Sequence, residues 1–345
     1  MKKIIFLLLF LLSLSSIGYI VYFLYHPSAC AIANVTEEKK QSYRIALFAP
    51  AVHAAMDEIE AGFTETMNQS KQATYHFDFY NGNGNPTLIR SEAEEIVRKE
   101  YDLVFTIGTA CSKITKEIMA KKNSSVPLVF CAIDDPVALH LIKSLHSSEN
   151  NVTGLTIAEQ HAEQVRFLKF FKPEITTVLL VYNPKESSGS EKNKQSLEAA
   201  LNAYNIQLRI VEIDNANEIQ QKVPSFLPNC ETLIIFTDHT ACAGIDMLVK
   251  LCNQYHVTLY ASTLSMGNRG AALCYGVHEA DHGVESAKKA RMILEDHAQP
   301  SDIPVAAVAN YKIKINKKTM QEQNLIVEQT LLSILGIVEV IEKEK

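Results

Sequence analysis

From Tyr43 onward, short apolar runs alternate with longer amphipathic stretches. Nine runs have the length and apolar content of buried strands: Arg44–Phe48, His76–Tyr80, Leu103–Ile107, Leu128–Ala132, Thr177–Tyr182, Gln207–Glu212, Thr232–Phe236, Thr258–Ala261 and Ala272–Val277. The segments between them carry apolar residues at helical spacing, as in Met56–Met67, Leu88–Lys99, Glu159–Phe171 and Ala241–Tyr255. Strand–helix alternation with short connections predicts an α/β protein whose parallel sheets are covered by helices on both faces.

The number of strands argues for two sheets rather than one. Nine or ten strands are many for a single open sheet, so two α/β lobes are the simpler arrangement. The segment Asn151–Thr156 is the expected first crossing between lobes, because it follows the polar loop Ser147–Asn150 and precedes a new helical pattern.

Composition and charge narrow the function classes. The 345 residues are 47% hydrophobic and 21% charged, which fits a folded globular chain of about two domains and excludes collagen-like, mucin-like and disordered chains. The net charge is −6, and the sequence contains no cluster of Lys and Arg. Such a surface repels phosphate backbones, so no nucleic-acid partner is expected.

The first thirty residues predict export. Lys2 and Lys3 precede an uncharged run from Ile4 to Tyr25, which as a helix would span roughly 33 Å, enough to cross a bilayer. The basic residues in front of the run orient the N-terminus toward the cytoplasm, so the body is expected to be extracytoplasmic. The segment from Pro27 to Cys30 resembles a bacterial lipoprotein processing site, in which Cys30 would carry lipid. Residues 1–30 are therefore an export signal or membrane anchor; retention, lipidation and cleavage all stay open.

Six further cysteines lie in the body, and none forms a CxxC pair. Their irregular spacing gives little support to a zinc knuckle or a redox pair. Because Cys131, Cys252 and Cys274 stand inside apolar runs, we expect mostly buried free thiols.

Polar residues gather where the predicted strands end. Open parallel sheets bind ligands beyond the carboxyl ends of their strands, and these ends carry mostly small, hydroxyl or carboxylate side chains without an evident nucleophile–base pair. This pattern predicts a polar-rimmed binding cleft with no catalytic residue, no metal and no cofactor. The candidate ligand-binding residues are His53, Thr109, Ala110, Asp134, Asn183, Glu186, Ser187, Ser188, Asp238 and Ser262.

Eight segments, in one order, carry a family resemblance. They are Tyr80–Pro86, Ile107–Ala110, Val126–Val137, Asn151–Gly154, Val181–Ser187, Thr237–Ala241, Tyr260–Thr263 and Arg269–Val277. Together they resemble the tryptophan/tyrosine-type solute-binding proteins of ABC transporters, whose fold is similar to that of type I periplasmic binding proteins. The resemblance runs from about Arg44 to Leu325. His239 and Ser188 stand where asparagine is common in the family, and Thr263-Leu264 replaces an acidic or polar pair.

The resemblance implies two doubly wound parallel-sheet lobes joined by a three-strand hinge. The N-terminal lobe would comprise residues 43–154 and 278–305, and the C-terminal lobe residues 155–277 and 306–325. The hinge would lie near Thr153–Thr156, Gly276–His278 and Ala306–Lys312.

The implied function is capture of a small molecule between the lobes for presentation to an ABC transporter permease. The ligand would be amino-acid-like, with an aromatic or otherwise apolar side chain. Asp238 is our choice for its ammonium, whereas Thr109 and Ser187 or Ser188 are choices for its carboxylate. The competing interpretation of Asp238 is a helix N-cap.

Two other functions compete with solute binding. His278-Glu279-Ala280-Asp281-His282 satisfies H-E-x-x-H, the pattern of zinc hydrolases. Its position directly after the strand Ala272–Val277 argues against a mid-helix zinc pair. A ligand-sensing ectodomain with no transport role is the second alternative, because fold alone does not fix function.

The C-terminal residues are unusually apolar. Asn324–Ile341 holds more apolar residues than one amphipathic face requires. We expect residues 326–345 to form a C-terminal helix that packs on a lobe or a partner subunit, and a second membrane-active segment is the alternative.

Overall fold

The computed structural model describes residues 40–52, 54–157, 160–186, 189–327 and 338–341. The expected anchor with Cys30, and the candidate residues His53, Ser187 and Ser188, lie outside the described residues. Within these ranges, no helix has both the length and the apolar content that crossing a membrane requires.

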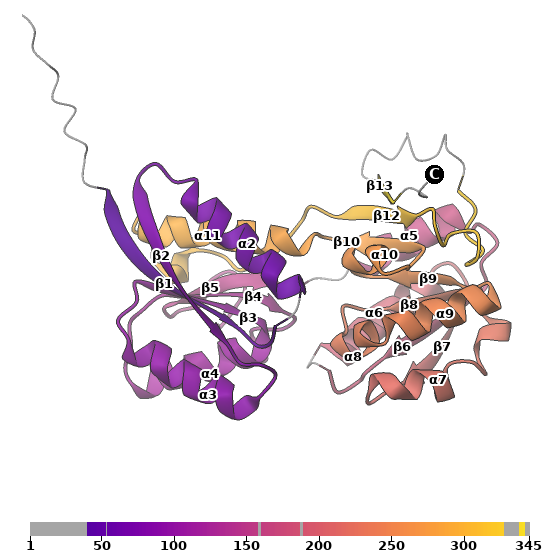
Figure 1. Ribbon diagram of the computed structural model, residues 1–345, viewed down its shortest axis with the longest axis horizontal. Coiled ribbons are helices and arrows are strands. Elements are labelled where there is room, and N and C mark those ends of the chain that lie inside the picture. The colour runs from indigo at the N-terminus through magenta and orange to yellow at the C-terminus, as the bar shows by residue number, and fades with distance from the viewer. Residues whose placement is uncertain (1–39, 53, 158–159, 187–188, 328–337, 342–345) are drawn as a thin grey trace, which may run out of the picture. The chain divides into compact units, whose positions relative to one another are not determined.

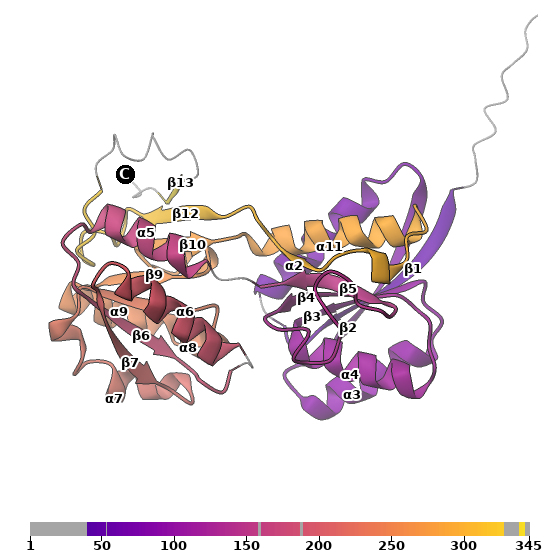
Figure 2. The same cartoon turned by 180° about the vertical axis from the view of Figure 1, so that it is seen from behind.

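The first lobe is built on a six-stranded sheet in the order β11-β5-β4-β3-β1-β2. Its strands are β1 (Gln41–Ala49), β2 (Ala73–Asn81), β3 (Leu103–Ile107), β4 (Leu128–Ile133), β5 (Val152–Thr156) and β11 (Ala306–Ala307). Strand β1 pairs in parallel with β3, β3 with β4, β4 with β5, and β5 with β11. Helices α2 (Ala54–Asn68) and α11 (Glu279–Leu294) cover one face, and α3 (Pro86–Arg98) and α4 (Gly108–Lys121) cover the other (Figures 1 and 2).

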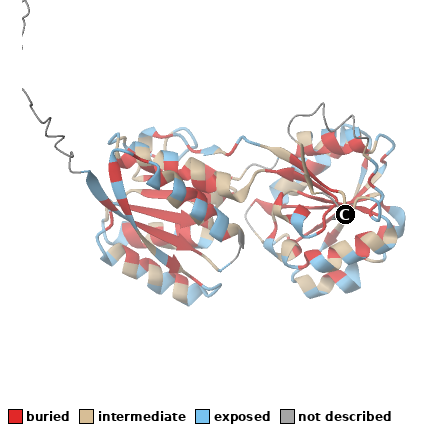
Figure 3. Cartoon of the chain, turned by 45° about the horizontal axis from the view of Figure 1, so that its top comes forward, coloured by how far each residue is buried: buried red, intermediate tan, exposed pale blue. Residues whose placement is uncertain are grey.

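Alternate residues of β1 explain why this sheet needs helices on both sides. Ile45 and Leu47 belong to the core shared with α2 and α11, while Ala46 and Phe48 belong to the core shared with α3 and α4. All four side chains are fully buried. A strand that is apolar on both faces is stable only when both faces are covered. Figure 3 shows the result, with buried strands inside and exposed residues on the outer helices.

The second lobe is built on a seven-stranded sheet in the order β13-β12-β10-β9-β8-β6-β7. Its strands are β6 (Thr177–Tyr182), β7 (Gln207–Glu212), β8 (Thr232–Ile235), β9 (Thr258–Ala261), β10 (Leu273–Gly276), β12 (Lys312–Asn316) and β13 (Val338–Ile341). Neighbouring strands in this sheet are parallel, except that β10 and β12 are antiparallel. Its α-helices are α5 (His161–Phe171), α6 (Ser190–Asn202), α7 (Ile219–Lys222), α8 (His239–Ala243), α9 (Ile245–Tyr255) and α10 (Ser265–Asn268). Short 3₁₀ turns are η2 (Ala216–Glu218) and η3 (Leu227–Asn229), with η4 (Pro300–Asp302) in the first lobe.

The chain passes between the two sheets at three places, which confirms the predicted fold class. It leaves the first sheet after β5, returns between β10 and α11, and leaves again between β11 and β12. The boundaries differ slightly from the expected ones. All of β5 belongs to the first sheet, and Ala306 and Ala307 pair there with Leu155 and Thr156.

One predicted helix is split in two. The pattern predicts a continuous helix over Ala241–Tyr255, but α8 ends at Ala243 and α9 begins at Ile245. Gly244 stands between them, and a β-carbon there would lie 2.1 Å from Cδ1 of Ile219. A larger residue at the break between α8 and α9 would therefore require the Ile219 side chain to move.

The predicted C-terminal helix is wrong at its far end. Val338–Ile341 forms strand β13, which pairs in parallel with β12 so that Val338 lies opposite Ile313. Three of its four residues are β-branched, which favours a strand, and the edge of β12 offers unpaired backbone groups. Residues 328–337 and 342–345 lie outside the described residues.

The cysteines behave as small core residues. None of the six described cysteines is in a disulfide, and all but Cys242 are buried. Burial raises the pKa of Cys111 and of Cys274 to about 12, so these thiols stay protonated and unreactive at neutral pH. The expectation of buried free thiols is confirmed for the five buried ones.

Helices α2 and α11 lie in direct backbone contact. A β-carbon at Gly283 would stand 2.0 Å from the carbonyl oxygen of Ile59, and one at Gly62 would stand 2.3 Å from the carbonyl oxygen of Ala280. The adjacent His282 is only 5% exposed, and its Nδ1 atom has no hydrogen-bond partner. Burial lowers the pKa of His282 from 6.5 to about 4, so its imidazole is neutral in the folded chain at neutral pH.

We predict that His282 makes the fold acid-sensitive. The unfolded chain takes up a proton near pH 6.5 while the folded chain resists it, so the stability contribution is complete above pH 6.5 and is lost as pH falls toward 4. In urea unfolding between pH 7 and pH 4, His282→Leu should lose about 2 kcal/mol less stability than the unmodified chain. His146→Leu, at an exposed position, is the control for removing a histidine. Equal pH slopes for the His282 variant and the unmodified chain would contradict this assignment.

Candidate functional site

The carboxyl edge of the second sheet holds Asp238 in a fixed position. Asp238 is the N-cap of α8, where its Oδ1 accepts the Ala241 N–H at 2.8 Å. Its Oδ2 accepts the Asn183 N–H, from the end of β6, at 2.6 Å. The residue is 4% exposed, and burial raises the pKa of its carboxyl group while the backbone N–H bonds oppose that rise. One carboxylate therefore ties together the ends of β6 and β8.

Glu186 stands beside it and is held from the same helix start. Its carboxylate accepts the Thr240 hydroxyl at 2.8 Å and the His239 backbone N–H at 3.3 Å, and lies 3.2 Å from His239 Nδ1. Burial alone would raise the pKa of Glu186, but the hydrogen bonds from His239 and Thr240 outweigh it and lower the pKa to about 2. The same contact raises the pKa of His239, whose side chain is 70% exposed.

Asn183 completes this group, which we call the acidic cluster (Asn183, Glu186, Asp238, His239 and Thr240). Its Nδ2 donates to the Thr240 hydroxyl at 3.0 Å, and its Oδ1 accepts the Lys185 N–H at 2.9 Å. The cluster presents an ionised carboxylate in Glu186, together with amide and hydroxyl groups, at the edge where parallel sheets bind ligands.

Ser262 lies at the end of β9 and belongs to a neighbouring network. Its hydroxyl accepts the Gln164 Nε2–H at 3.1 Å, and the Gln164 carbonyl accepts the Tyr260 hydroxyl at 3.1 Å. Nδ1 of His161 lies 3.1 Å from Gln164 Oε1, and the imidazole ring lies 5.1 Å from the ring of Phe236. A hydrogen-bonded network on α5 thus reaches Ser262, and its His161 ring packs on the buried ring of Phe236.

The carboxyl edge of the first sheet presents a helix N-terminus. Helix α4 begins at Gly108, directly after β3, and no side chain caps its first N–H groups. Gly108 has φ +76°, a conformation that favours glycine. Thr109 is partly exposed and Ala110 is exposed in this first turn, while Asp134 follows directly on β4. Unsatisfied N–H groups and the helix dipole favour an anion at such a helix start.

The candidate residues thus separate into groups. The structure brings Asn183, Glu186 and Asp238 together, whereas Thr109 and Ala110 share the start of α4. Pattern analysis missed Thr240, Gln164 and His161 as site residues. The hydroxyl of Thr240, two positions after Asp238, was a usable signal, but Gln164 and His161 lie on a helix and gave none.

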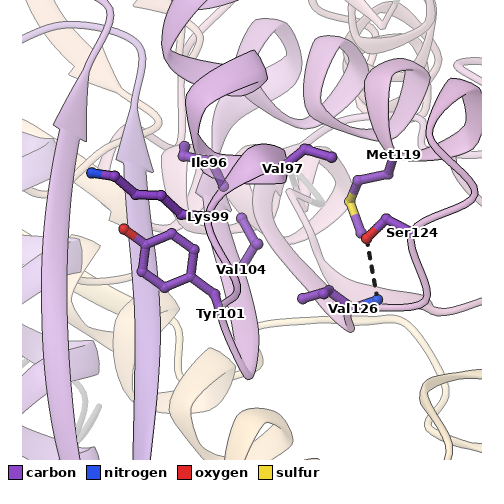
Figure 4. Close-up of a pocket in the computed structure, with 8 residues that line it drawn as sticks. All are labelled: Ile96, Val97, Lys99, Tyr101, Val104, Met119, Ser124 and Val126. Atoms are coloured by element: carbon purple, nitrogen blue, oxygen red, sulfur yellow. Dashed lines mark hydrogen bonds between the residues drawn. The ribbon is translucent and has the colours of Figure 1, made fainter.

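A small hollow in the first lobe lies at the opposite edge of the sheet (Figure 4). Its lining is mostly apolar and comes from the ends of α3 and α4, the start of β3 and the loops before β3 and β4: Ile96, Val97, Lys99, Tyr101, Val104, Met119, Ser124 and Val126. The Ser124 hydroxyl accepts the Val126 N–H at 3.4 Å there. Since the polar strand ends lie at the other edge, this hollow is separate from the acidic cluster and from the start of α4.

The H-E-x-x-H segment does not have the geometry of a zinc site. His278 is the N-cap of α11 with extended backbone, and its Nε2 lies 2.5 Å from Oε1 of Glu339. His282 is buried against α2 instead. Within the described ranges, no three His, Cys, Asp or Glu side chains gather in a way that could hold a metal ion.

A family model and several known proteins match this chain. The family model described as ABC transporter substrate binding protein matches residues 44–336. The Tyrosine-binding protein of Clostridioides difficile (strain R20291) is 23% identical over 289 residues, which cover 83% of this chain and 82% of that protein. The crystal structure of an ABC domain in complex with L-Trp from Streptococcus pneumonia has a TM-score of 0.74 at 23% identity, covering 87% of this chain and all of that one.

A conserved domain protein from Vibrio cholerae has a TM-score of 0.73 at 21% identity, covering 86% of this chain and 99% of the other. At these identities the structural matches establish the shared fold, and the family match spans most of the sequence. The chain belongs to the ABC transporter substrate-binding protein family.

Proposed function

We propose that this substrate-binding protein captures an amino acid with an aromatic side chain between its lobes and delivers it to an ABC transporter permease. The main support for the proposal is that the C-terminal strand ends of the two sheets carry groups suited to opposite charges. One sheet edge holds the acidic cluster, and the other holds the uncapped start of α4. A zwitterion needs an anion opposite its ammonium and N–H or hydroxyl donors opposite its carboxylate.

The charges suit these two roles at neutral pH. Glu186 is ionised because its pKa is about 2, so the acidic cluster attracts an ammonium. The first turn of α4 supplies N–H donors with Thr109 beside them, which suits a carboxylate. The names of the C. difficile and S. pneumonia relatives, which refer to tyrosine and L-Trp, support the same ligand class.

The other predicted contacts remain part of the proposal. Asp134, Asn183, Ser262 and Ala110 would line the ligand site from the strand ends. His53, Ser187 and Ser188 keep their predicted roles, although they lie outside the described residues.

Substrate-binding proteins of ABC transporters are extracytoplasmic, and we propose that residues 1–30 hold this one at the outer face of the membrane. The support is the uncharged run from Ile4 to Tyr25 behind two lysines. Cys30 would carry the lipid if the segment is processed as a lipoprotein.

We predict that L-tyrosine or L-tryptophan stabilises the protein against heat, because a ligand that binds only the folded state shifts unfolding by mass action. At a concentration 100-fold above the Kd, the gain is about 2.7 kcal/mol. The chain contains no tryptophan, so the fluorescence of added L-tryptophan reports binding without protein background. D-tryptophan, glucose and adenosine are the controls in the same thermal-shift screen. Stabilisation by a sugar or nucleoside alone would contradict the proposed ligand class.

We predict that Asp238→Asn weakens amino-acid binding at least tenfold, because the cluster loses one of its two negative charges. Asparagine is as good an N-cap as aspartate, so α8 should keep its cap and the fold should stay intact. Asp246→Asn, an exposed acid on α9 of the same lobe, is the matched control and should bind normally. If Asp238→Asn binds as tightly as the unmodified protein while folding correctly, Asp238 is only a helix cap.

A further inference from the structure

The C-terminal strand β13 lies beyond the part of the chain that the family model matches, which ends at residue 336. It lies alongside β12 in both views of the ribbon (Figures 1 and 2). The register sets Val338 opposite Ile313 and Glu339 opposite Lys314. Val338 also packs against the core beneath the sheet. The strand is thus an addition to the edge of the second lobe, held by backbone pairing and one apolar contact.

Glu339 joins two basic side chains of that lobe. Its Oε1 lies 2.5 Å from Nε2 of His278, and its Oε2 lies 3.5 Å from Nζ of Lys314. The Lys314 side chain is 11% exposed and that of Glu339 is 34% exposed. A lysine so far removed from water is stable only with compensation, and a nearby carboxylate supplies it. These contacts give β13 a specific ionic attachment in addition to its backbone pairing.

One of these basic residues stands on a segment that connects the lobes. His278 follows β10 and occupies the N-cap position of α11, so it lies where the chain returns to the first lobe. Lys314 is the third residue of β12, the first strand after the chain leaves β11. Glu339 therefore links one connecting segment, at His278, to the interior of the strand that follows another. Motion of lobes about a hinge is absorbed by backbone rotation at a few such positions.

We propose that β13 is a latch on the hinge: through Glu339 it ties His278 to Lys314 and slows the lobe movement that accompanies ligand capture. The role in ligand capture rests on the proposed function, whereas the attachment to the hinge does not. Removing the Glu339 carboxylate breaks its contacts with His278 and Lys314, so the backbone around His278 and at the start of β12 becomes more mobile. The cores of both lobes stay intact.

Amide hydrogen exchange of the full chain in lipid nanodiscs tests the attachment without any ligand. The variants are Glu339→Gln, His278→Gln and the double variant, with Glu198→Gln on the exposed face of α6 as the matched control. The single latch variants should exchange at least threefold faster in peptides covering residues 277–279 and 308–312, and the control should not. The double variant should match Glu339→Gln, because that change alone already removes the contact with His278. Unchanged exchange in these peptides, in variants whose melting temperatures stay within a few degrees of the unmodified chain, would overturn the latch.

Stopped-flow fluorescence with L-tryptophan as the probe tests the consequence for capture. Glu339→Gln should raise the rate of the ligand-binding phase at least threefold, and the control should leave it unchanged. Equal rates for Glu339→Gln and the unmodified chain would show that the strand is purely structural. If the unmodified chain does not bind the probe while the exchange effect is present, the proposed ligand fails and the attachment stands.

Discussion

Both sheets bury both of their faces, and the placement of every functional group depends on this constraint. A parallel strand such as β1, with Ile45 and Leu47 toward one layer of helices and Ala46 and Phe48 toward the other, has no room for polar side chains. Most of the candidate site residues therefore stand where strands end or helices begin. Asn183, Asp238 and Ser262 each follow directly or closely on a strand, and Thr109 follows on β3. The carboxyl ends of parallel strands lie at one edge, so residues far apart in the sequence become neighbours there. The pairing of Asn183 with Asp238 across 55 positions is the clearest example.

This constraint also explains what the sequence could predict. All nine expected strands occur, because runs such as Leu103–Ile107 are long enough and apolar enough to be recognised without knowing their partners. Strand ends then identified Asn183, Glu186 and Asp238, which the fold brings together. The hydrogen bonds between them were not predictable, since they depend on the side-by-side order of β6 and β8. Gln164 was missed because it lies on the buried face of an ordinary amphipathic helix, and only packing brings it to Ser262.

The C-terminal residues show where prediction from local sequence fails. The apolar content of Asn324–Ile341 predicted a helix, yet Val338–Ile341 is a strand because the edge of β12 offers backbone partners. Tertiary pairing outweighs local pattern in so short a segment. Its position next to Lys314 and His278 gives the strand a role that composition could not suggest. The same applies to α11, whose H-E-x-x-H sequence stands at the helix start and, through Ala280, packs on α2.

We propose that an amino acid contacts the carboxyl edges of both sheets. A crystal structure of the protein grown with L-tryptophan or L-tyrosine would show whether it does. We expect an ammonium within hydrogen-bond distance of Glu186 or Asp238, and a carboxylate at the first turn of α4. A ligand bound instead at the hollow between Lys99 and Val126, or contacting only one of the two edges, would contradict it.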